Sequence, residues 1–375
     1  MLIKFARLGV LAAGVLCAPG SQAGNTYSVK FLTTDGASEI RLNAINDAGQ
    51  VVGSSFGADA LFQAVLWSGN ATTMLGAPGS GDSDARALNN AGQVAGYINL
   101  NDNTVNRAAL WDGAVVTELA TAAGRFSHAD GVNDAGVAVG RSNAFGSSNG
   151  RAMMWQGGNA IELDSLGGLN AAALAVNNAG QVIGYSTIAG SSDRHAALWS
   201  DGSVTDLGTL GGHASFARAI NASGQIAGYS NVAGDAVTHA TLWEGGMLRD
   251  LGTLGGSTSA AYGINDAGQV VGHALTATQS LHATMWDGNV TIDLNDFLDT
   301  GLISEGWVLI DASDINNHGW IIGEAWNLRT GATQAFLMSL DAAGDPAAVP
   351  EPATCGLVLG GIAMLGLARR RKLRR

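Results

Sequence analysis

Ile45-Asn46-Asp47-Ala48-Gly49-Gln50-Val51-Val52-Gly53 is the first of seven related phrases in this chain of 375 residues. The asparagine in the second place of each phrase follows the one before it by 43, 44, 44, 44, 44 and 51 residues. A regular spacing of this size indicates repeated structural units, each too small to bury its apolar side chains alone. The seven asparagines are Asn46, Asn89, Asn133, Asn177, Asn221, Asn265 and Asn316.

Each unit is expected to hold four short strands. In residues 171–208, apolar and β-branched stretches alternate with glycine-containing turns, as at Asn177–Gly180 and Ser200–Gly202. The expected strands of this unit are 171–176, 181–185, 195–199 and 203–207. Four antiparallel strands in a period of 44 residues are typical of a β-propeller blade. The sequence therefore predicts an all-β fold, a seven-bladed β-propeller.

The two ends of the repeat region complement each other. Residues 27–32 stand before the first phrase and align with a fourth strand, whereas the seventh unit supplies only strands two and three after Asn316 (320–323 and 335–340). Pairing of these pieces would close the ring through a shared blade, and an open solenoid needs no such complement. We therefore expect one propeller over residues 24–341, closed by its N-terminal strand. The seventh unit is also about seven residues longer, around Asn295–Trp307.

A tryptophan stands 21 or 22 residues after six of the asparagines, and Met338 takes its place in the seventh unit. One large apolar residue at a constant offset indicates packing between neighbouring blades, because an aromatic side chain buries a large area. A row of tryptophans that stacks on carbohydrate is the alternative. The six are Trp67, Trp111, Trp155, Trp199, Trp243 and Trp286.

Residues 1–23 have the parts of a secretory signal peptide. Lys4 and Arg7 precede an apolar helix-forming stretch, and small residues end the segment, so cleavage is expected between Ala23 and Gly24. A transmembrane helix is the alternative, but the stretch is short and ends at Pro19-Gly20. The sequence therefore predicts export through the inner membrane.

The C-terminus carries a second apolar segment. A linker, 342–349, leads to Pro350, Glu351 and Pro352, and an apolar run from Cys355 to Ala368 follows. As a helix, residues 353–368 would be roughly 24 Å long, short of a hydrocarbon core of about 30 Å. We expect a short transmembrane helix whose basic end stays on the cytoplasmic side. The basic residues are Arg369, Arg370, Arg371, Lys372, Arg374 and Arg375.

This order, Pro-Glu-Pro, apolar helix and basic end, resembles the PEP-CTERM sorting signal of Gram-negative bacteria. The resemblance covers residues 350–375. It implies recognition and processing by an exosortase, transient association with the inner membrane, and a mature protein at the cell surface or outside the cell. It also implies a place in exopolysaccharide or biofilm. A plain tail anchor is the alternative.

The repeat region resembles the extracellular HAF-repeat family. The phrases that carry the resemblance are His195–Trp199, His239–Trp243 and His282–Trp286, with Asp206–Gly212 and Asp250–Gly256. The phenylalanine that names the family is replaced by small residues except at Phe336. The resemblance covers nearly all of residues 27–340 and implies an exported β-rich repeat protein without a settled biochemical activity.

Charge and cysteine content narrow the function classes. Residues 24–348 hold 11 Lys and Arg against 30 Asp and Glu, a net charge of 11 − 30 = −19. Such a body repels phosphates, so no nucleic-acid partner is expected. Cys17 and Cys355 lie in the terminal apolar segments, which leaves the repeats without thiol chemistry or disulfides.

The polar residues that recur at the same place in several units are interpreted as structural. His195, His239 and His282 share one place in the repeat with Gln63, Arg107, Arg151 and Gln334, which indicates a hydrogen-bonding position. Asp47, Asp134 and Asp266 stand in turns where other units have asparagine; turn formation is favoured over a calcium array. No metal-ligand spacing, phosphate loop or nucleophile motif is present. We predict no catalytic residues, no metal and no cofactor.

The residues that break the repeat are the candidate ligand site. They lie three and five places before each asparagine, on one side of the first strand if side chains alternate. If that strand is innermost, they surround a central channel. The candidate ring comprises Arg41, Arg86, His128, Asp130, Arg218 and Tyr262. An acidic or neutral glycan bound through Arg86, Arg218 and Tyr262 is the hypothesis; freedom of these positions to vary is the alternative.

The sequence thus predicts an exported, surface-sorted, non-enzymatic module that binds or builds the extracellular polysaccharide matrix. The second hypothesis is a glycan lyase or hydrolase on a propeller scaffold, since one fold can carry many functions. A spacer or surface-layer protein with neither pocket nor ligand is the third.

Overall fold

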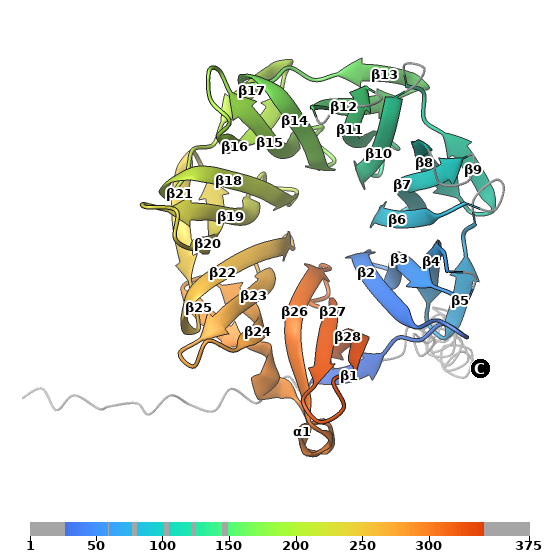
Figure 1. Ribbon diagram of the computed structural model, residues 1–375, viewed down its shortest axis with the longest axis vertical. Coiled ribbons are helices and arrows are strands. Elements are labelled where there is room, and N and C mark those ends of the chain that lie inside the picture. The colour runs from blue at the N-terminus through green and yellow to red at the C-terminus, as the bar shows by residue number, and fades with distance from the viewer. Residues whose placement is uncertain are drawn as a thin grey trace, which may run out of the picture.

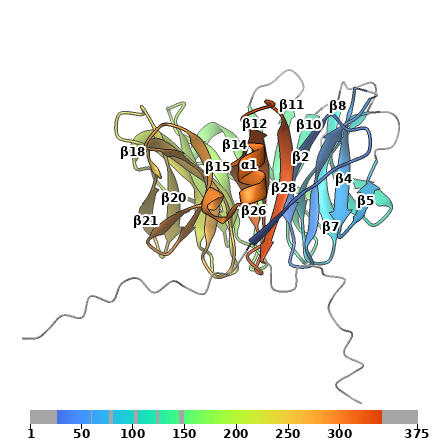
Figure 2. The same cartoon turned by 90° about the horizontal axis from the view of Figure 1, so that it is seen from below.

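The computed structural model describes residues 27–340 except 59, 77–80, 101–104, 122–124 and 145–148. This part of the chain is all-β, with 28 strands, one short α-helix and one 3₁₀ turn. Consecutive strands pair antiparallel into four-stranded sheets, which stand side by side around a central opening (Figure 1). Seen from the side, the strands of the sheets run upright between the two faces of the ring (Figure 2).

The first strand of each sheet lies nearest the axis (Figure 1). These inner strands are β2 (Glu39–Ile45), β6 (Ser83–Leu88), β10 (Arg125–Val132), β14 (Gly167–Val176), β18 (Gly211–Ile220), β22 (Gly255–Ile264) and β26 (Trp307–Ile315). The second strands are β3 (Gln50–Phe56), β7 (Gln93–Leu100), β11 (Ala138–Ala144), β15 (Val182–Ile188), β19 (Ile226–Val232), β23 (Val270–Thr276) and β27 (Ile321–Asn327).

The third and fourth strands form the outer part of each sheet. The third strands are β4 (Phe62–Ser68), β8 (Val105–Asp112), β12 (Gly150–Gln156), β16 (Arg194–Ser200), β20 (Thr238–Glu244), β24 (Leu281–Asp287) and β28 (Thr333–Leu340). The outermost are β5 (Ala71–Met74), β9 (Val115–Glu118), β13 (Asn159–Glu162), β17 (Ser203–Asp206), β21 (Met247–Gly252), β25 (Val290–Asp293) and β1 (Tyr27–Phe31). A single parallel contact between Arg194 and Ala214 joins two neighbouring sheets.

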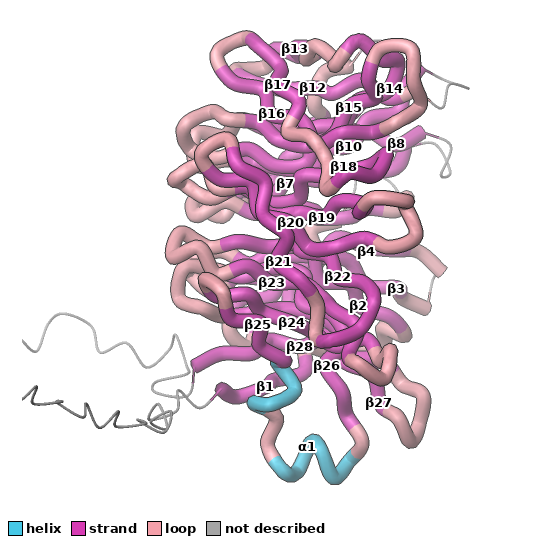
Figure 3. Tube along the Cα trace, turned by 90° about the vertical axis from the view of Figure 1, so that its left-hand side faces the viewer, coloured by secondary structure: helices cyan, strands magenta, loops and turns pink. Residues whose placement is uncertain are grey.

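Strand β1 comes from the other end of the chain. It pairs antiparallel with β28, from Tyr27 opposite Leu340 to Phe31 opposite Phe336. The extra residues of the last unit form the 3₁₀ turn η1 (Leu294–Phe297) and the helix α1 (Thr300–Glu305). Figure 3 draws both in cyan, with α1 at the edge of the ring next to β26. The Phe297 ring of η1 meets Tyr27 of β1 edge-on at 4.9 Å.

The tryptophans lie between sheets, which confirms the packing interpretation over the carbohydrate row. All six are at most 5% exposed, and Met338 is fully buried. Trp199, for example, packs with Val139 and Ala152 of the preceding sheet, and its Nε1 donates to the Asp164 carbonyl at 2.6 Å. Ligands therefore have no access to these rings.

The seven asparagines join the sheets at one end of the opening. Each donates from Nδ2 to the backbone carbonyl of the next asparagine along the chain, and Asn316 donates to Asn46, at 2.9–3.2 Å. Each side-chain oxygen also accepts a bond within its own turn, as from Gln50 N to Asn46 at 2.9 Å. We call this set the asparagine belt. Only the turn bond was expected from the sequence, because the contact between units spans 43 or more residues.

A β-bulge interrupts the inner strands three places before each asparagine. The pairing of β14 with β15 shifts between Ala173 and Ala175, so Leu174 is the extra residue. The strict alternation assumed for the first strand is therefore wrong at this point. At the bulge the backbone comes so close to the second strand that a Cβ on Gly184 would lie 2.0 Å from the Ala172 oxygen. A glycine holds this place in every unit, from Gly53 to Gly323.

Candidate functional site

The bulged residues of the inner strands line a central cavity of about 770 Å³. All seven residues that stand three places before the asparagines take part: Asn43, Arg86, Asp130, Leu174, Arg218, Tyr262 and Ser313. Because a bulge turns two successive residues toward the same side, the places next to them also contribute, from Ala44 to Asp314. The inner-strand position assumed in the sequence analysis is thus the observed one.

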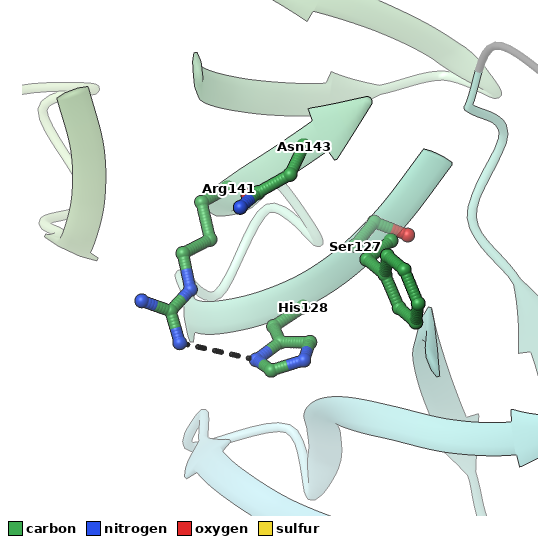
Figure 4. Close-up of a pocket in the computed structure, with 5 residues that line it drawn as sticks. Ser127, His128, Arg141 and Asn143 are labelled. Carbon is green, nitrogen blue, oxygen red and sulfur yellow. Dashed lines mark hydrogen bonds between the residues drawn. The ribbon is translucent and has the colours of Figure 1, made fainter. Parts of the chain in front are cut away.

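Five of the six candidate ring residues line this cavity, and His128 does not. His128 lies in a neighbouring cavity of about 240 Å³ with Phe126, Ser127, Arg141 and Asn143 (Figure 4). Its ring stacks on Tyr97 at 4.5 Å, and its Nδ1 lies 3.4 Å from an Arg141 nitrogen, which donates to it. Burial and the nearby Arg86 lower the pKa of His128 to about 4. A neutral imidazole therefore supports the wall of the site.

Arg86 is committed to partners inside the protein. Its Nε donates to Asp84 at 3.2 Å, and its Nη1 donates to Asp130. Burial alone would raise the pKa of Asp130, but Arg86 and Arg141 outweigh it and hold that pKa below its usual value. Removing one member of such a partly buried network leaves an uncompensated charge. Arg86, predicted as a ligand contact, lines the cavity and also holds Asp84 and Asp130 in its wall.

Aromatic rings run along one side of the opening. Tyr185 packs on Phe216 at 5.2 Å, Phe216 on Tyr229 at 5.2 Å, Tyr229 on Tyr262 at 6.4 Å, and Tyr262 on His273 at 5.4 Å. We call these five residues the aromatic arc. They come from β15, β18, β19, β22 and β23, and Tyr185 and Tyr262 line the cavity itself. The guanidinium of Arg218 lies 5.6 Å from the Tyr262 ring centre. Half-buried rings of this kind suit a ligand with an apolar face.

Carboxyl groups gather beside the arc on β26 and β27. Asp311 lies 3.3 Å from His273 Nδ1. Asp314 accepts from the backbone of Ile45 at 3.1 Å and of Ile315 at 2.9 Å, and burial raises its pKa to about 7. Burial and then Asp311 raise the pKa of Glu324. The cavity is therefore acidic on this sheet and aromatic on the sheets before it.

Asp314, Glu324, Arg141 and most of the aromatic arc were not predicted as site residues from the sequence. Asp314 stands where other units have alanine or glycine, as at Ala44 and Gly263, so its departure from the repeat was visible. The others lie on second strands, one place after the repeated glycine, where the residues also vary. These positions were passed over because only the first strand was expected to face the channel.

The recurring histidines bind carboxylates of their own sheets. The distances from Nδ1 are 2.8 Å for His195 to Asp206, 2.8 Å for His239 to Asp250 and 2.5 Å for His282 to Asp293. Arg107 and Arg151 take the same place in other units and pair with Glu118 and Glu162. This agrees with a hydrogen-bonding position. Within the ranges that the structure describes, no three His, Cys, Asp or Glu side chains gather as metal ligands.

Comparison with known proteins decides the nature of the C-terminus. Residues 348–372 match the PEP-CTERM protein-sorting motif. The motif is an exosortase substrate signal, and it indicates an exported, surface-sorted protein whose C-terminus is membrane-anchored before processing. The sorting residues, the basic cluster, the linker and the signal peptide with Ala23 and Gly24 lie outside the described residues. In the described part of the chain, no helix has the length and apolar character to cross a bilayer.

The repeat region is similar in fold to solved propellers. The β-propeller domain of the trilobed protease from Pyrococcus furiosus, described as having an open velcro topology, superposes with a TM-score of 0.53 at 12% identity. The alignment covers 84% of this chain and 99% of that one. The fold is therefore a β-propeller. No curated protein matches the sequence.

Two further structures align less well. TolB from Acinetobacter baumannii has a TM-score of 0.45 at 12% identity, over 77% of this chain and 63% of that chain. A puromycin-hydrolysing peptidase from Mycobacterium tuberculosis has a TM-score of 0.48 at 13% identity, over 80% of this chain and 54% of that chain. This protein thus spans less than two thirds of either of these two chains.

Proposed function

We propose that the protein is a non-enzymatic, surface-sorted propeller of seven blades, closed by β1, that binds extracellular polysaccharide in its central cavity. The observation that carries the proposal is the aromatic arc, because sugar rings present flat C–H faces that pack on aromatic side chains. The pairing of β1 with β28 and the complete asparagine belt support ring closure. The sorting motif and the resemblance to HAF-repeat proteins support a place outside the cell.

Binding is tested with the purified repeat region and the exopolysaccharide of the producing cells. We expect retention of the protein on the immobilised polymer without shortening of the chains. Replacing Tyr185 and Tyr262 by alanine should weaken retention at least about tenfold, since each loses a stacking surface worth about 1 kcal/mol or more. Trp326→Ala is the matched control, an exposed aromatic ring that does not line the cavity. Equal retention of all three proteins would remove the cavity as the binding site.

Processing of the tail is part of the same proposal. An exosortase would cut near Pro350–Pro352 and release the propeller from its short anchor. Mass spectrometry of the protein recovered from the cell surface should show a C-terminus close to these residues. Recovery of a mature form that still ends at Arg375 would instead support a retained tail anchor.

A specific cluster favours the second candidate, a polysaccharide-cleaving enzyme. Tyr262 and His273 come from the sheet β22–β25 and Asp311 from the adjoining sheet, and the three lie together beside the cavity. A histidine held by a carboxylate next to a tyrosine has the groups needed for general acid–base chemistry. Shortening of the polymer, abolished by His273→Gln, would replace the binding proposal with this one.

A further inference from the structure

Four arginines line the central cavity, and three of them have partners within the protein. Arg41 Nε pairs with Glu39 at 2.7 Å. Arg86 holds two aspartates, and Arg141 donates to His128 and compensates the charge of Asp130. Arg218 is different. Among the described residues it has neither an ion pair nor a hydrogen bond, and its side chain is exposed toward the cavity.

The surroundings of Arg218 explain why its guanidinium has no ion-pair partner among the described residues. It occupies the bulge of β18, and the equivalent residues of the two neighbouring sheets are Leu174 and Tyr262, both without charge. The residue two places earlier in the strand is Phe216, part of the aromatic arc. The acidic side chains Asp311, Asp314 and Glu324 belong to β26 and β27, in a sheet that does not adjoin that of Arg218.

An unpaired guanidinium beside an aromatic ring can favour ligands that carry a negative charge over neutral ligands of the same shape. A guanidinium donates two parallel hydrogen bonds to a carboxylate, and this pair is stronger and more directional than a bond to a neutral hydroxyl. The Tyr262 ring, with the Arg218 guanidinium 5.6 Å from its centre, offers a flat surface beside that charge. Sugar rings that carry a carboxylate have both complementary parts.

We propose that the cavity selects uronate sugars, with the carboxylate paired to Arg218 and the sugar face packed on Tyr262 and the arc. This inference rests on the proposed glycan binding and names its chemical class. The net charge of −19 for residues 24–348 repels a polyanion at long range. Salt screens that repulsion beyond about 8–10 Å, whereas the contact pair inside the cavity is screened less. Binding is therefore expected at physiological salt and should depend on the local contact.

The test compares matched ligands and matched variants of the full repeat region. The ligands are uronate oligosaccharides of the galacturonate, mannuronate and glucuronate series, each beside its carboxyl-reduced counterpart, which keeps the ring and loses the charge. The variants are Arg218→Gln and Arg218→Lys, with Arg249→Gln as the control, an arginine of β21 that donates to Asn289 at 3.0 Å and does not line the cavity. Thermal unfolding of each variant checks the fold, which an exposed side chain should not disturb.

At least one uronate series should bind the unaltered protein about tenfold or more tighter than its reduced counterpart, as expected of a charge-assisted pair. Arg218→Gln should abolish this preference and leave the affinity for the reduced sugar unchanged. Arg218→Lys should retain part of the preference, and Arg249→Gln should retain all of it. Equal binding of acidic and reduced sugars, lost in the Tyr185 and Tyr262 variants, would overturn the uronate inference and keep glycan binding. Absence of binding to every uronate would also overturn it.

Discussion

At the scale of the residue, two neighbouring asparagines have different structural roles. Asn177 is buried and joins three backbone groups and Gln181, including the Asn221 carbonyl of the next unit at 3.1 Å. Asn178, one place later, is exposed, and among the described residues its side chain bonds only Asp134, through its amide nitrogen at 2.7 Å and its oxygen at 2.9 Å. Burial decides the difference, because a buried polar group without a partner is costly and an exposed one returns to water.

Asn177→Ala is therefore expected to lower the free energy of unfolding by about 2–4 kcal/mol, since the Gln181 amide loses its acceptor and the Asn221 carbonyl keeps only the Gly224 amide as a donor. Asn178→Ala, the matched control, should cost less than about 1 kcal/mol. Urea unfolding followed by tryptophan fluorescence measures both. Similar losses in the two variants would mean that the asparagine belt does not stabilise the ring.

Asp314 predicts a pH dependence of stability. Its pKa is about 7 in the folded protein, above the usual value of about 3.9 for an unfolded chain. The folded state therefore holds this proton where the unfolded state has lost it. The resulting stabilisation is fully present below about pH 4 and is lost as the pH rises toward 7. Asp314→Asn should flatten this decline, which urea midpoints between pH 4.5 and 8 would measure.

His128 provides the control of opposite sign for that measurement. Its folded pKa of about 4 lies below the usual 6.5, so the unfolded state binds the extra proton between these values. Stability from this group falls as the pH is lowered from about 6.5 to 4. His128→Gln should remove that fall and leave the decline toward pH 7 in place. If either variant changes the slope assigned to the other residue, the assignments are wrong.

At the scale of the element, the bulge and its glycine determine what faces the cavity. The bulge adds Leu174 to β14 without a partner and turns it toward the axis. The close approach of the β14 and β15 backbones at the bulge requires Gly184 in β15, because a side chain there would collide with the Ala172 carbonyl. The same pair of features recurs in each unit, so the variable residues are displayed on a constant backbone.

Gly184→Ala should accordingly destabilise the protein by about 3 kcal/mol or more, since backbone rather than a flexible side chain must move. Gly202→Ala is the control, at a turn with φ +73° and no atom within 4 Å of the added Cβ. It should cost about 1 kcal/mol, the penalty of a left-handed backbone alone. Thermal unfolding would compare the two, and a smaller loss for Gly184→Ala than for Gly202→Ala would contradict this account of the bulge.

At the scale of the whole molecule, the N-terminal strand connects the last unit to the first. Phe31 packs on Trp307 at 4.6 Å, Leu32 joins the core of the first unit, and the Thr33 carbonyl accepts from Trp67 at 3.1 Å. In a closed ring every sheet packs against two neighbours, so removing the closing strand weakens the packing of the sheets on both sides of it. In an open row of sheets, removing a terminal strand affects only the end unit.

Removal of residues 24–34 is expected to lower the melting temperature of the entire repeat region by roughly 10 °C or more, in a single cooperative transition. Truncation after residue 349 serves as the control and should leave the transition unchanged, because it spares every described contact. Calorimetry would separate the outcomes. A normal transition that lacks only the heat of one strand would show that the propeller does not depend on closure.

The sequence by itself determined what repeats. Four features are local patterns: the period, the turn asparagines, the buried tryptophans and the sorting motif. Each can be recognised in the sequence because it recurs in several units or has a fixed order of parts. Only the tertiary structure decided which variable residues act together. Arg86 and Arg218 occupy the same place in the repeat, yet Arg86 meets Asp130 from the next unit, and Arg218 meets the uncharged Tyr262. The sheets bring together residues about 44 positions apart or more, and charge pairing depends on that distance in space rather than on position in the repeat.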